Sequence, residues 1–249
     1  MNVRKTTTSL TLKQVLKLQG AADAAIYLGL PLNCFVTISF RATYPRPVPS
    51  VVMASVVKHL RDYVRGRYGV AWLWIAEFQS DPHVHMLLHL PQFMTMDQLK
   101  ALLEKWLAKL AVEIEPETVH AKMVTGWDGE FEAYLENLAW TMRYIFKGGD
   151  RETRRYLSYV DEWGDGEGIV DGKRYSISEA ISVAVQSRLF PISDLSIPRY
   201  SRPASLPRIF GDSPKAASSR PIAKWVEDLC PQTLDAPVRR SLQRSRSVS

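Results

Sequence analysis

The chain has 249 residues, of which 46% are hydrophobic and 10% aromatic, a composition that fits a folded protein and excludes disorder throughout. Its two cysteines, Cys34 and Cys230, are too few for a disulfide framework or a cysteine zinc site. The first residues lack the apolar segment of a signal peptide, and no apolar run approaches the ~18 residues of a membrane helix, so we expect a cytoplasmic protein.

The net charge of +6 comes from the C-terminal end of the sequence. Residues 198–249 contain ten lysines and arginines and four acidic residues, which leaves 22 of each sign in residues 1–197. The same segment contains seven prolines together with many serines. We therefore predict a disordered basic tail over residues 198–249, with a DNA-binding arm as the alternative. The overall charge is a weak guide to function.

The first part of the sequence predicts a helical segment, a strand and a second helix. Residues 1–30 form a helical lead-in whose role the sequence does not define. Residues 34–40 alternate between apolar and polar side chains, as a half-buried strand does, and Thr37 and Ser39 share its polar face. Residues 50–64 carry apolar side chains at helical spacing.

The middle of the sequence predicts a hairpin followed by an amphipathic helix. Residues 70–78 are an almost continuous apolar run, typical of a central strand. Residues 84–90 form its neighbour, because the intervening Ser-Asp-Pro sequence favours a turn. Residues 95–110 then show the clearest helical periodicity of the chain, and Thr95 begins it with capping-box spacing.

A strand at residues 119–124, a helix at 130–147 and a further helix at 178–189 complete the prediction. The order of elements predicts an α+β fold, with a central antiparallel sheet and flanking helices. We expect three regions: the lead-in at residues 1–30, a main domain at 31–197 and the tail at 198–249.

The most specific local pattern is His83-Val84-His85, at the start of the second hairpin strand. Alternate residues of a strand share a face, so both imidazoles point the same way, and Glu77 on the preceding strand is the natural third ligand of a metal ion. The alternative is that both histidines lie on a solvated strand end and Glu77 is the last exposed residue. His89 shares their parity but lies ~13 Å from His85 along the strand, so we predict a DNA contact there.

The second pattern is Tyr144-Ile145-Phe146-Lys147, at the end of the helix predicted at 130–147. Helical phase places Tyr144 opposite the apolar stripe, on the side that carries Asn137 and Trp140. Most tyrosines at such positions are structural or simply exposed. Lys147 strengthens the functional interpretation, because its ammonium can orient a phosphate or favour the phenolate form of the tyrosine.

Three segments in this order, Phe35-Val36-Thr37-Ile38-Ser39-Phe40, Glu77 with His83-Val84-His85, and Tyr144-Ile145-Phe146-Lys147, resemble the three motifs of rolling-circle replication initiators in the HUH endonuclease superfamily. The resemblance covers about residues 33–150. It implies a nuclease fold of ferredoxin-like topology, Mg²⁺ or Mn²⁺ bound by His83, His85 and Glu77, and Tyr144 as the nucleophile assisted by Lys147. The product would be a 5′-phosphotyrosyl link to DNA.

The resemblance also implies partners. The substrate is single-stranded or locally melted DNA, and the candidates for contacting it are Trp140, Asn137, Arg143, Thr37, Ser39 and His89. The sequence lacks a glycine-rich Walker motif, so we expect a host helicase to unwind the DNA and a host polymerase to extend the 3′ end.

Three alternatives stay open. Single-tyrosine transposases of the same superfamily share the motif order, whereas conjugative relaxases usually place the tyrosine before the histidines. A zinc hydrolase that activates water can use the same three ligands. A non-catalytic DNA-binding module or repressor would retain the fold without the chemistry.

Overall fold

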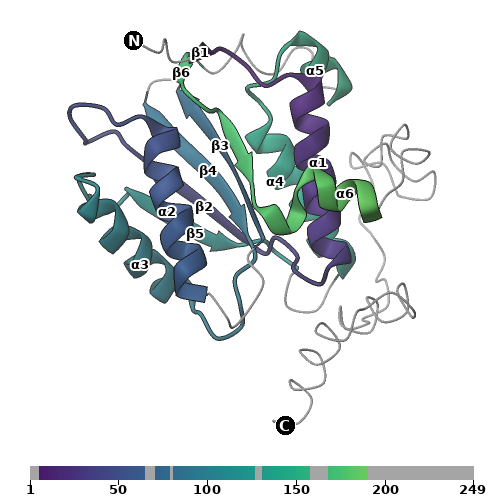
Figure 1. Cartoon of the computed structure of the whole chain (residues 1–249), viewed down its shortest axis with the longest axis horizontal. Helices are drawn as coiled ribbons and strands as arrows, with labels where there is room; N and C mark the ends of the chain where they lie inside the picture. The colour runs from purple at the N-terminus through teal and green to yellow at the C-terminus, as the bar shows by residue number, and fades with distance from the viewer. Residues whose placement is uncertain (1–5, 65–70, 79–80, 127–130, 158–167, 190–249) are drawn as a thin grey trace.

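The computed structural model describes residues 6–64, 71–78, 81–126, 131–157 and 168–189 (Figure 1). The tail predicted at 198–249 lies outside these residues. The helices are α1 (Leu12–Tyr27), α2 (Pro49–Val64), α3 (Met96–Lys109), α4 (Phe131–Ile145), α5 (Arg151–Tyr156) and α6 (Val183–Leu189), with a short 3-10 helix at Glu179–Ile181. The strands are β1 (Thr6–Thr7), β2 (Cys34–Ser39), β3 (Trp72–Phe78), β4 (Pro82–Leu88), β5 (Val119–Met123), β6 (Val170–Asp171) and β7 (Tyr175–Ile177).

Five of the strands form one antiparallel sheet in the order β5-β2-β4-β3-β7, while β1 pairs with β6. β3 and β4 form the predicted hairpin, and β2 lies on the other side of β4. Both β2 and β3 are antiparallel to β4, so they run in the same direction and finish at the same end of the sheet. The predicted α+β class with a central antiparallel sheet is confirmed.

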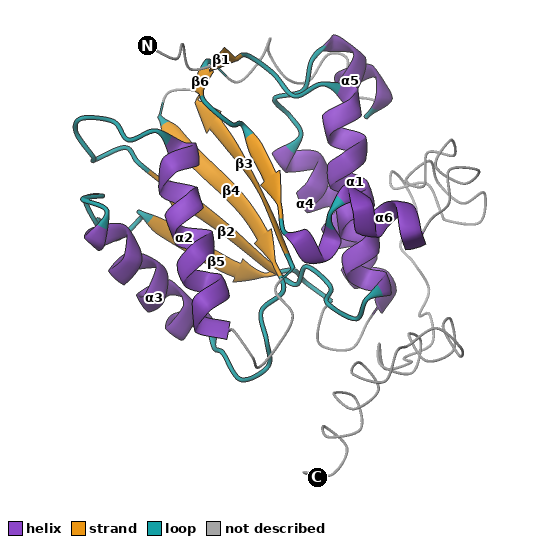
Figure 2. Ribbon diagram, viewed as in Figure 1, coloured by secondary structure: helices purple, strands orange, loops and turns teal. Residues whose placement is uncertain are grey.

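Helices cover both faces of this sheet (Figure 2). On one face, the apolar side chains of β2, β3 and β4, Trp74 and Met86 among them, pack against α2 and α3. On the other face, Phe35 and Leu87 pack against α1 and α4. Because successive side chains of a strand point to opposite faces, the parity of a position decides which helix layer it meets.

The lead-in predicted at residues 1–30 contains α1, which packs into the same core as α4. A capping box fixes its first turn: the Thr11 hydroxyl accepts a hydrogen bond from Gln14 N, and the Gln14 side chain accepts one from Thr11 N. The capping box predicted at Thr95 is confirmed in the same way for α3.

The largest differences from the predicted elements lie after residue 147, where the helix α5 was not predicted. The helix predicted at 178–189 is interrupted, because Ser182 has an extended backbone (φ −66°, ψ 166°) that separates the 3-10 helix from α6. The strands β6 and β7 were not predicted, since two or three residues are too few to show alternation. In the part of the chain that the structure describes, no helix combines the length and the apolar character needed to cross a membrane.

Candidate metal centre and the adjoining tyrosine

The β3–β4 hairpin brings Glu77, His83 and His85 to one face of the sheet, the face covered by α1 and α4. Glu77 lies directly opposite His83 in the register of the two strands, and His85 follows two residues later. The side chains of Glu77 and His85 are buried, with 1% and 2% of their surfaces exposed. This burial excludes the alternative in which Glu77 is the last exposed residue of its strand.

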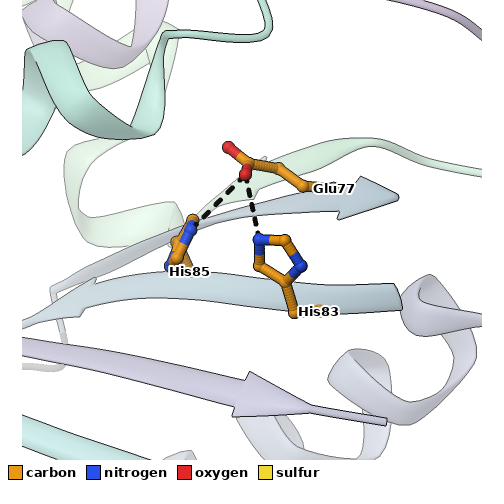
Figure 3. A group of neighbouring side chains, drawn as sticks. All are labelled: Glu77, His83 and His85. Atoms are coloured by element: carbon orange, nitrogen blue, oxygen red, sulfur yellow. Dashed lines mark hydrogen bonds and ion pairs between the residues drawn. The ribbon is translucent and has the colours of Figure 1, made fainter. Parts of the chain in front are cut away.

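One carboxylate oxygen is the centre of the group (Figure 3). Glu77 Oε2 lies 3.0 Å from His83 Nε2 and 3.4 Å from His85 Nε2. The ammonium of Lys147, from the segment that follows α4, lies 3.1 Å from the same oxygen. Three nitrogen atoms from two parts of the sequence therefore converge on one buried oxygen.

The outer nitrogen of each imidazole has a partner that fixes the ring. His83 Nδ1 lies 2.9 Å from the carbonyl oxygen of Asp81, so it carries a proton and donates it. His85 Nδ1 lies 3.0 Å from Thr37 Oγ1, on the neighbouring strand β2. Both rings therefore present Nε2 to Glu77. Histidines that bind metal ions are commonly oriented in this way, by a hydrogen bond to the ring nitrogen that does not face the metal.

The three inner atoms have the chemistry of a cation site. With Nδ1 protonated, a neutral His83 directs the lone pair of Nε2 at the Glu77 carboxylate, and an intervening cation satisfies both groups. His85 Nε2 faces the same carboxylate oxygen at the longer distance of 3.4 Å. The three ligand atoms all lie within 4.8 Å of one another. Ligands bound at ~2.1 Å and at right angles are about 3 Å apart, which matches the shorter distances.

Burial also keeps His85 in the form that binds metal. Desolvation lowers the pKa of His85 below its ordinary value, opposed by the hydrogen bond and the charge of Glu77, which raise it. The imidazole therefore favours its neutral state. The residues fit a divalent ion, but two imidazoles and one carboxylate suit Mn²⁺, Fe²⁺ and Zn²⁺ alike, so the ligands do not identify the metal.

Tyr144 lies beside this group. Its ring centroid is 5.2 Å from that of His85, and its side chain is 41% exposed, so one side of the ring packs on the centre and the other meets solvent. Phe35 on β2 stacks on His85 at 5.4 Å and meets Tyr144 edge-on at 6.3 Å. Lys147 Nζ lies 4.2 Å from the centroid of the Tyr144 ring. A cation therefore lies between the tyrosine and the carboxylate.

The residues predicted to contact DNA lie on two parts of the structure, helix α4 and the sheet. Trp140 is 44% exposed, and the Arg143 guanidinium lies over its ring at 5.1 Å while Arg143 Nη2 donates a hydrogen bond to the Leu157 carbonyl. Asn137 Nδ2 donates to the carbonyl of Ala133 within the same helix.

The candidates on the sheet have closer structural partners. Thr37 holds His85, and Ser39 Oγ accepts a hydrogen bond from Arg41 N. His89 lies beyond the far end of β4, where its ring pairs with the carbonyl of Pro31. The structure does not bring His89 together with the centre.

Two participants were missed from the sequence. Phe35 was seen only as part of a strand motif, yet it contacts both His85 and Tyr144. Phe35 lies two residues before Thr37 and therefore shares its face of the strand, which was the sequence signal that could have placed it beside the site. Asp81 was seen as a turn residue, and its backbone carbonyl orients His83. No sequence signal identifies a backbone partner of this kind.

Comparison with protein-family models, with curated proteins and with solved structures finds no match for this chain. The functional assignment therefore depends on the geometry of the chain's own residues.

Proposed function

We propose that this protein is a divalent-metal-dependent DNA-nicking enzyme of the HUH type, in which Tyr144 forms a covalent 5′-phosphotyrosyl intermediate, and that it initiates rolling-circle replication. The observation that carries the proposal is the contact between Tyr144 and His85: a half-exposed phenol 5.2 Å, ring to ring, from a buried imidazole of a three-ligand cluster.

The strand order supports the same assignment. The elements β2, α2, β3, β4, α3 and β5 follow one another as β-α-β-β-α-β, with the four strands in one antiparallel sheet. This is the order of the ferredoxin-like arrangement that the resemblance implies. Fold alone does not establish activity, so the order adds to the argument only together with the site.

His83, His85 and Glu77 are the residues that hold the metal. A divalent ion bound there supplies Lewis-acid stabilisation of the negative charge on the oxygens of a scissile phosphate, with Mg²⁺ or Mn²⁺ as the physiological candidates. Thr37 and the Asp81 carbonyl keep both imidazoles in the orientation that binds it. The burial of Glu77 and His85 excludes water from the inner side of the site.

Tyr144 performs the covalent step. Its oxygen attacks the phosphorus of the phosphodiester and releases the phenolic proton to solvent. A tyrosine O–P bond forms as the bond to the 3′ oxygen breaks, and the leaving oxygen takes up a proton. The energy of the phosphodiester is retained in the phosphotyrosine, so the strand can later be rejoined without a nucleotide cofactor. The free 3′ hydroxyl can serve a host polymerase.

Lys147 has two roles in this scheme. Its ammonium lies 4.2 Å from the Tyr144 ring, where a positive charge favours the developing phenolate. It is also near enough to the ligand cluster to pair with a phosphate oxygen, because its present partner Glu77 is a metal ligand.

Single-stranded or locally melted DNA is the proposed substrate. On α4, the exposed rings of Tyr144 and Trp140 offer aromatic faces for bases, and the Arg143 guanidinium that lies over Trp140 offers a positive charge for a phosphate. A duplex cannot bring its phosphate to the cluster with the flanking bases stacked and paired, so a host helicase is the expected partner.

The test is detection of a protein–DNA adduct. The full-length protein is incubated with a pool of single-stranded oligonucleotides and Mn²⁺, and covalent species are separated on a denaturing gel and mapped by mass spectrometry. We expect one adduct, at Tyr144, which disappears in Tyr144→Phe and with a chelator. The matched control is Tyr63→Phe, which changes a half-exposed tyrosine on a different helix, α2, and should retain the adduct.

The other outcomes identify the alternatives. Cleavage that survives in Tyr144→Phe assigns a water-activating hydrolase to the same ligands. Sequence-specific binding without cleavage, unaffected by His83→Ala and His85→Ala, assigns a DNA-binding module or repressor. Strand joining between two oligonucleotides that carry transposon ends, without replication activity, assigns a transposase.

A further inference from the structure

The loop between β2 and α2 exposes an aromatic side chain almost completely. Tyr44 is 92% exposed, the highest value among the large hydrophobic side chains that the structure describes. The next most exposed, Ile169 and Val51, reach 62% and 60%. A lone exposed residue is common on protein surfaces, so the surroundings of Tyr44 decide its meaning.

The residues on either side of Tyr44 are held in place. Thr43 is buried, its Oγ1 accepts a hydrogen bond from Glu113 N at 3.0 Å, and its own N donates to the Phe40 carbonyl. On the other side, the Arg46 guanidinium lies 5.3 Å from the centroid of the Phe78 ring. The prolines at positions 45, 47 and 49 restrict the backbone further. The loop is built to present the ring outward.

This loop lies at the same end of the sheet as the metal cluster. β2 and β3 finish together there, and Figure 1 shows the β2–α2 loop projecting from that end. Arg46 packs on Phe78, the residue after Glu77. Arg41 Nε lies 3.9 Å from Asp81 Oδ2, and the Asp81 carbonyl orients His83. Arg46 therefore contacts the chain neighbour of one proposed metal ligand, and Arg41 contacts the residue whose carbonyl orients another.

We propose that Tyr44, Arg41 and Arg46 form a second docking site for single-stranded nucleic acid, in which an unpaired base stacks on Tyr44 and the two guanidinium groups bind the flanking phosphates. The inference rests on the proposed function, because it supplies a place for the strand outside the metal centre. An aromatic ring between cations is the combination with which proteins hold single strands without reading their sequence.

The charges of the loop favour nucleic acid over other occupants. Residues 40–49 contain two arginines and no acidic residue. The side chain of Arg41 is 76% exposed, and its ion pair with Asp81 is long and solvated, so it can exchange that partner for a phosphate at little cost. The Arg46 guanidinium lies over the Phe78 ring at 5.3 Å, and its N–H groups can donate hydrogen bonds to phosphate oxygens.

Binding is tested separately from catalysis. The full chain with Tyr144→Phe is titrated against a fluorescently labelled single-stranded oligonucleotide of mixed sequence in the presence of a chelator, with anisotropy as the readout. In this background we expect Tyr44→Ala to weaken binding about tenfold and Tyr44→Trp to retain or strengthen it. Tyr63→Ala, which removes a half-exposed aromatic from α2, is the control and leaves affinity unchanged.

The arginines are tested through salt dependence. Arg41→Met combined with Arg46→Met should reduce the slope of log affinity against log salt by about 1.4, the value for two lost phosphate contacts on a single strand. Circular dichroism should show unchanged folding in all these variants, since the altered side chains are exposed.

The docking site is overturned by unchanged binding in Tyr44→Ala, by an equal loss in Tyr63→Ala, or by a loss in Tyr44→Trp as large as in Tyr44→Ala. Binding to anionic phospholipid vesicles but not to oligonucleotides overturns it too, in favour of a membrane surface. If the wild type forms an adduct at Tyr144 and Tyr44→Ala binds the oligonucleotide normally, the docking site is wrong and the proposed nicking activity stands. If Tyr44→Ala binds more weakly but the wild type forms no adduct, the proposed nicking activity is wrong and the docking site stands.

Discussion

Lys147 Nζ and His83 Nε2 contact the same oxygen of Glu77, at 3.1 and 3.0 Å. A divalent cation bound by Glu77 would therefore compete with this ammonium for one carboxylate oxygen inside a buried site. Lys147 is 5% exposed, so repulsion between the two positive charges is poorly screened. The ammonium has a second neighbour, the ring of Tyr144, whose centroid lies 4.2 Å from Nζ.

Replacing this lysine should strengthen metal binding. We expect Lys147→Met to bind Mn²⁺ at least about tenfold more tightly than the wild type, because one competing charge is removed. The free energy of unfolding in the presence of a chelator should fall by about 3 kcal/mol, since Glu77 loses a buried partner. Isothermal titration calorimetry and denaturant unfolding measure the two effects.

The control for Lys147→Met is Lys100→Met, which removes a lysine from a solvent-exposed pair with Glu104 on α3 and should change neither quantity. Weaker Mn²⁺ binding by a folded Lys147→Met variant contradicts the competition, and shows that the lysine supports the ligands.

Thr37→Val should weaken metal binding without unfolding the protein. Valine preserves the shape of threonine but removes the hydroxyl that holds His85 Nδ1, so the ring loses its fixed orientation. We expect a loss of about tenfold in Mn²⁺ affinity, typical of an outer partner of a metal ligand. Ser39→Ala is the matched control, because Ser39 lies on the same face of β2 and its hydroxyl contacts Arg41 N. Equal affinities for Thr37→Val and Ser39→Ala would show that Thr37 has no positioning role.

The local patterns of the sequence predicted much of the sheet and of the ligand set. Alternation identified β2, and the apolar run of β3 followed by a short turn identified the hairpin. Once the hairpin is given, parity alone places His83 and His85 on one face with Glu77. These relations depend on residues close together in the chain, which is why one sequence suffices to predict them.

Contacts between segments far apart in the chain could not be predicted from the sequence. Helical phase separated Tyr144 from the apolar stripe, but it did not reveal that Phe35 contacts it from β2, 109 positions earlier in the numbering. The ion pair between Lys147 and Glu77 depends on how α4 docks on the sheet. Thr37 was likewise predicted to contact DNA. Its position in the alternating pattern shows which face of the sheet the side chain lies on, but it does not show that the hydroxyl contacts His85 on the neighbouring strand.

Cys34 should be inert in the folded protein. Its side chain is fully buried on the face of β2 opposite Thr37, and its Sγ lies 3.8 Å from Met96 Sδ. Burial raises the pKa of this thiol to about 12, so the reactive thiolate is scarce at neutral pH. In a Cys230→Ser variant we expect no reaction with a thiol reagent such as DTNB until denaturant is added. Rapid stoichiometric labelling under native conditions would show that the α2–α3 face of the sheet opens.

His89 should make the stability of the protein depend on pH. Burial lowers the pKa of His89 below its ordinary value, opposed by the hydrogen bond to the Pro31 carbonyl, which raises it. The unfolded chain therefore binds a proton more readily than the folded chain once the pH drops below about 6.5. The stabilising contribution of neutral His89 is complete above that pH and is lost as the pH falls through the folded pKa.

Denaturant unfolding with a chelator present, at several values between pH 5 and pH 8, measures this linkage. We expect the free energy of unfolding of the wild type to fall more steeply toward low pH than that of His89→Asn, by at most about 1.4 kcal/mol per pH unit, the limit for one proton. Asparagine keeps a donor for the Pro31 carbonyl, and His85 is present in both proteins, so the difference reports His89 alone. Parallel curves for the wild type and His89→Asn would mean that this imidazole accepts a proton as easily in the folded chain as in water.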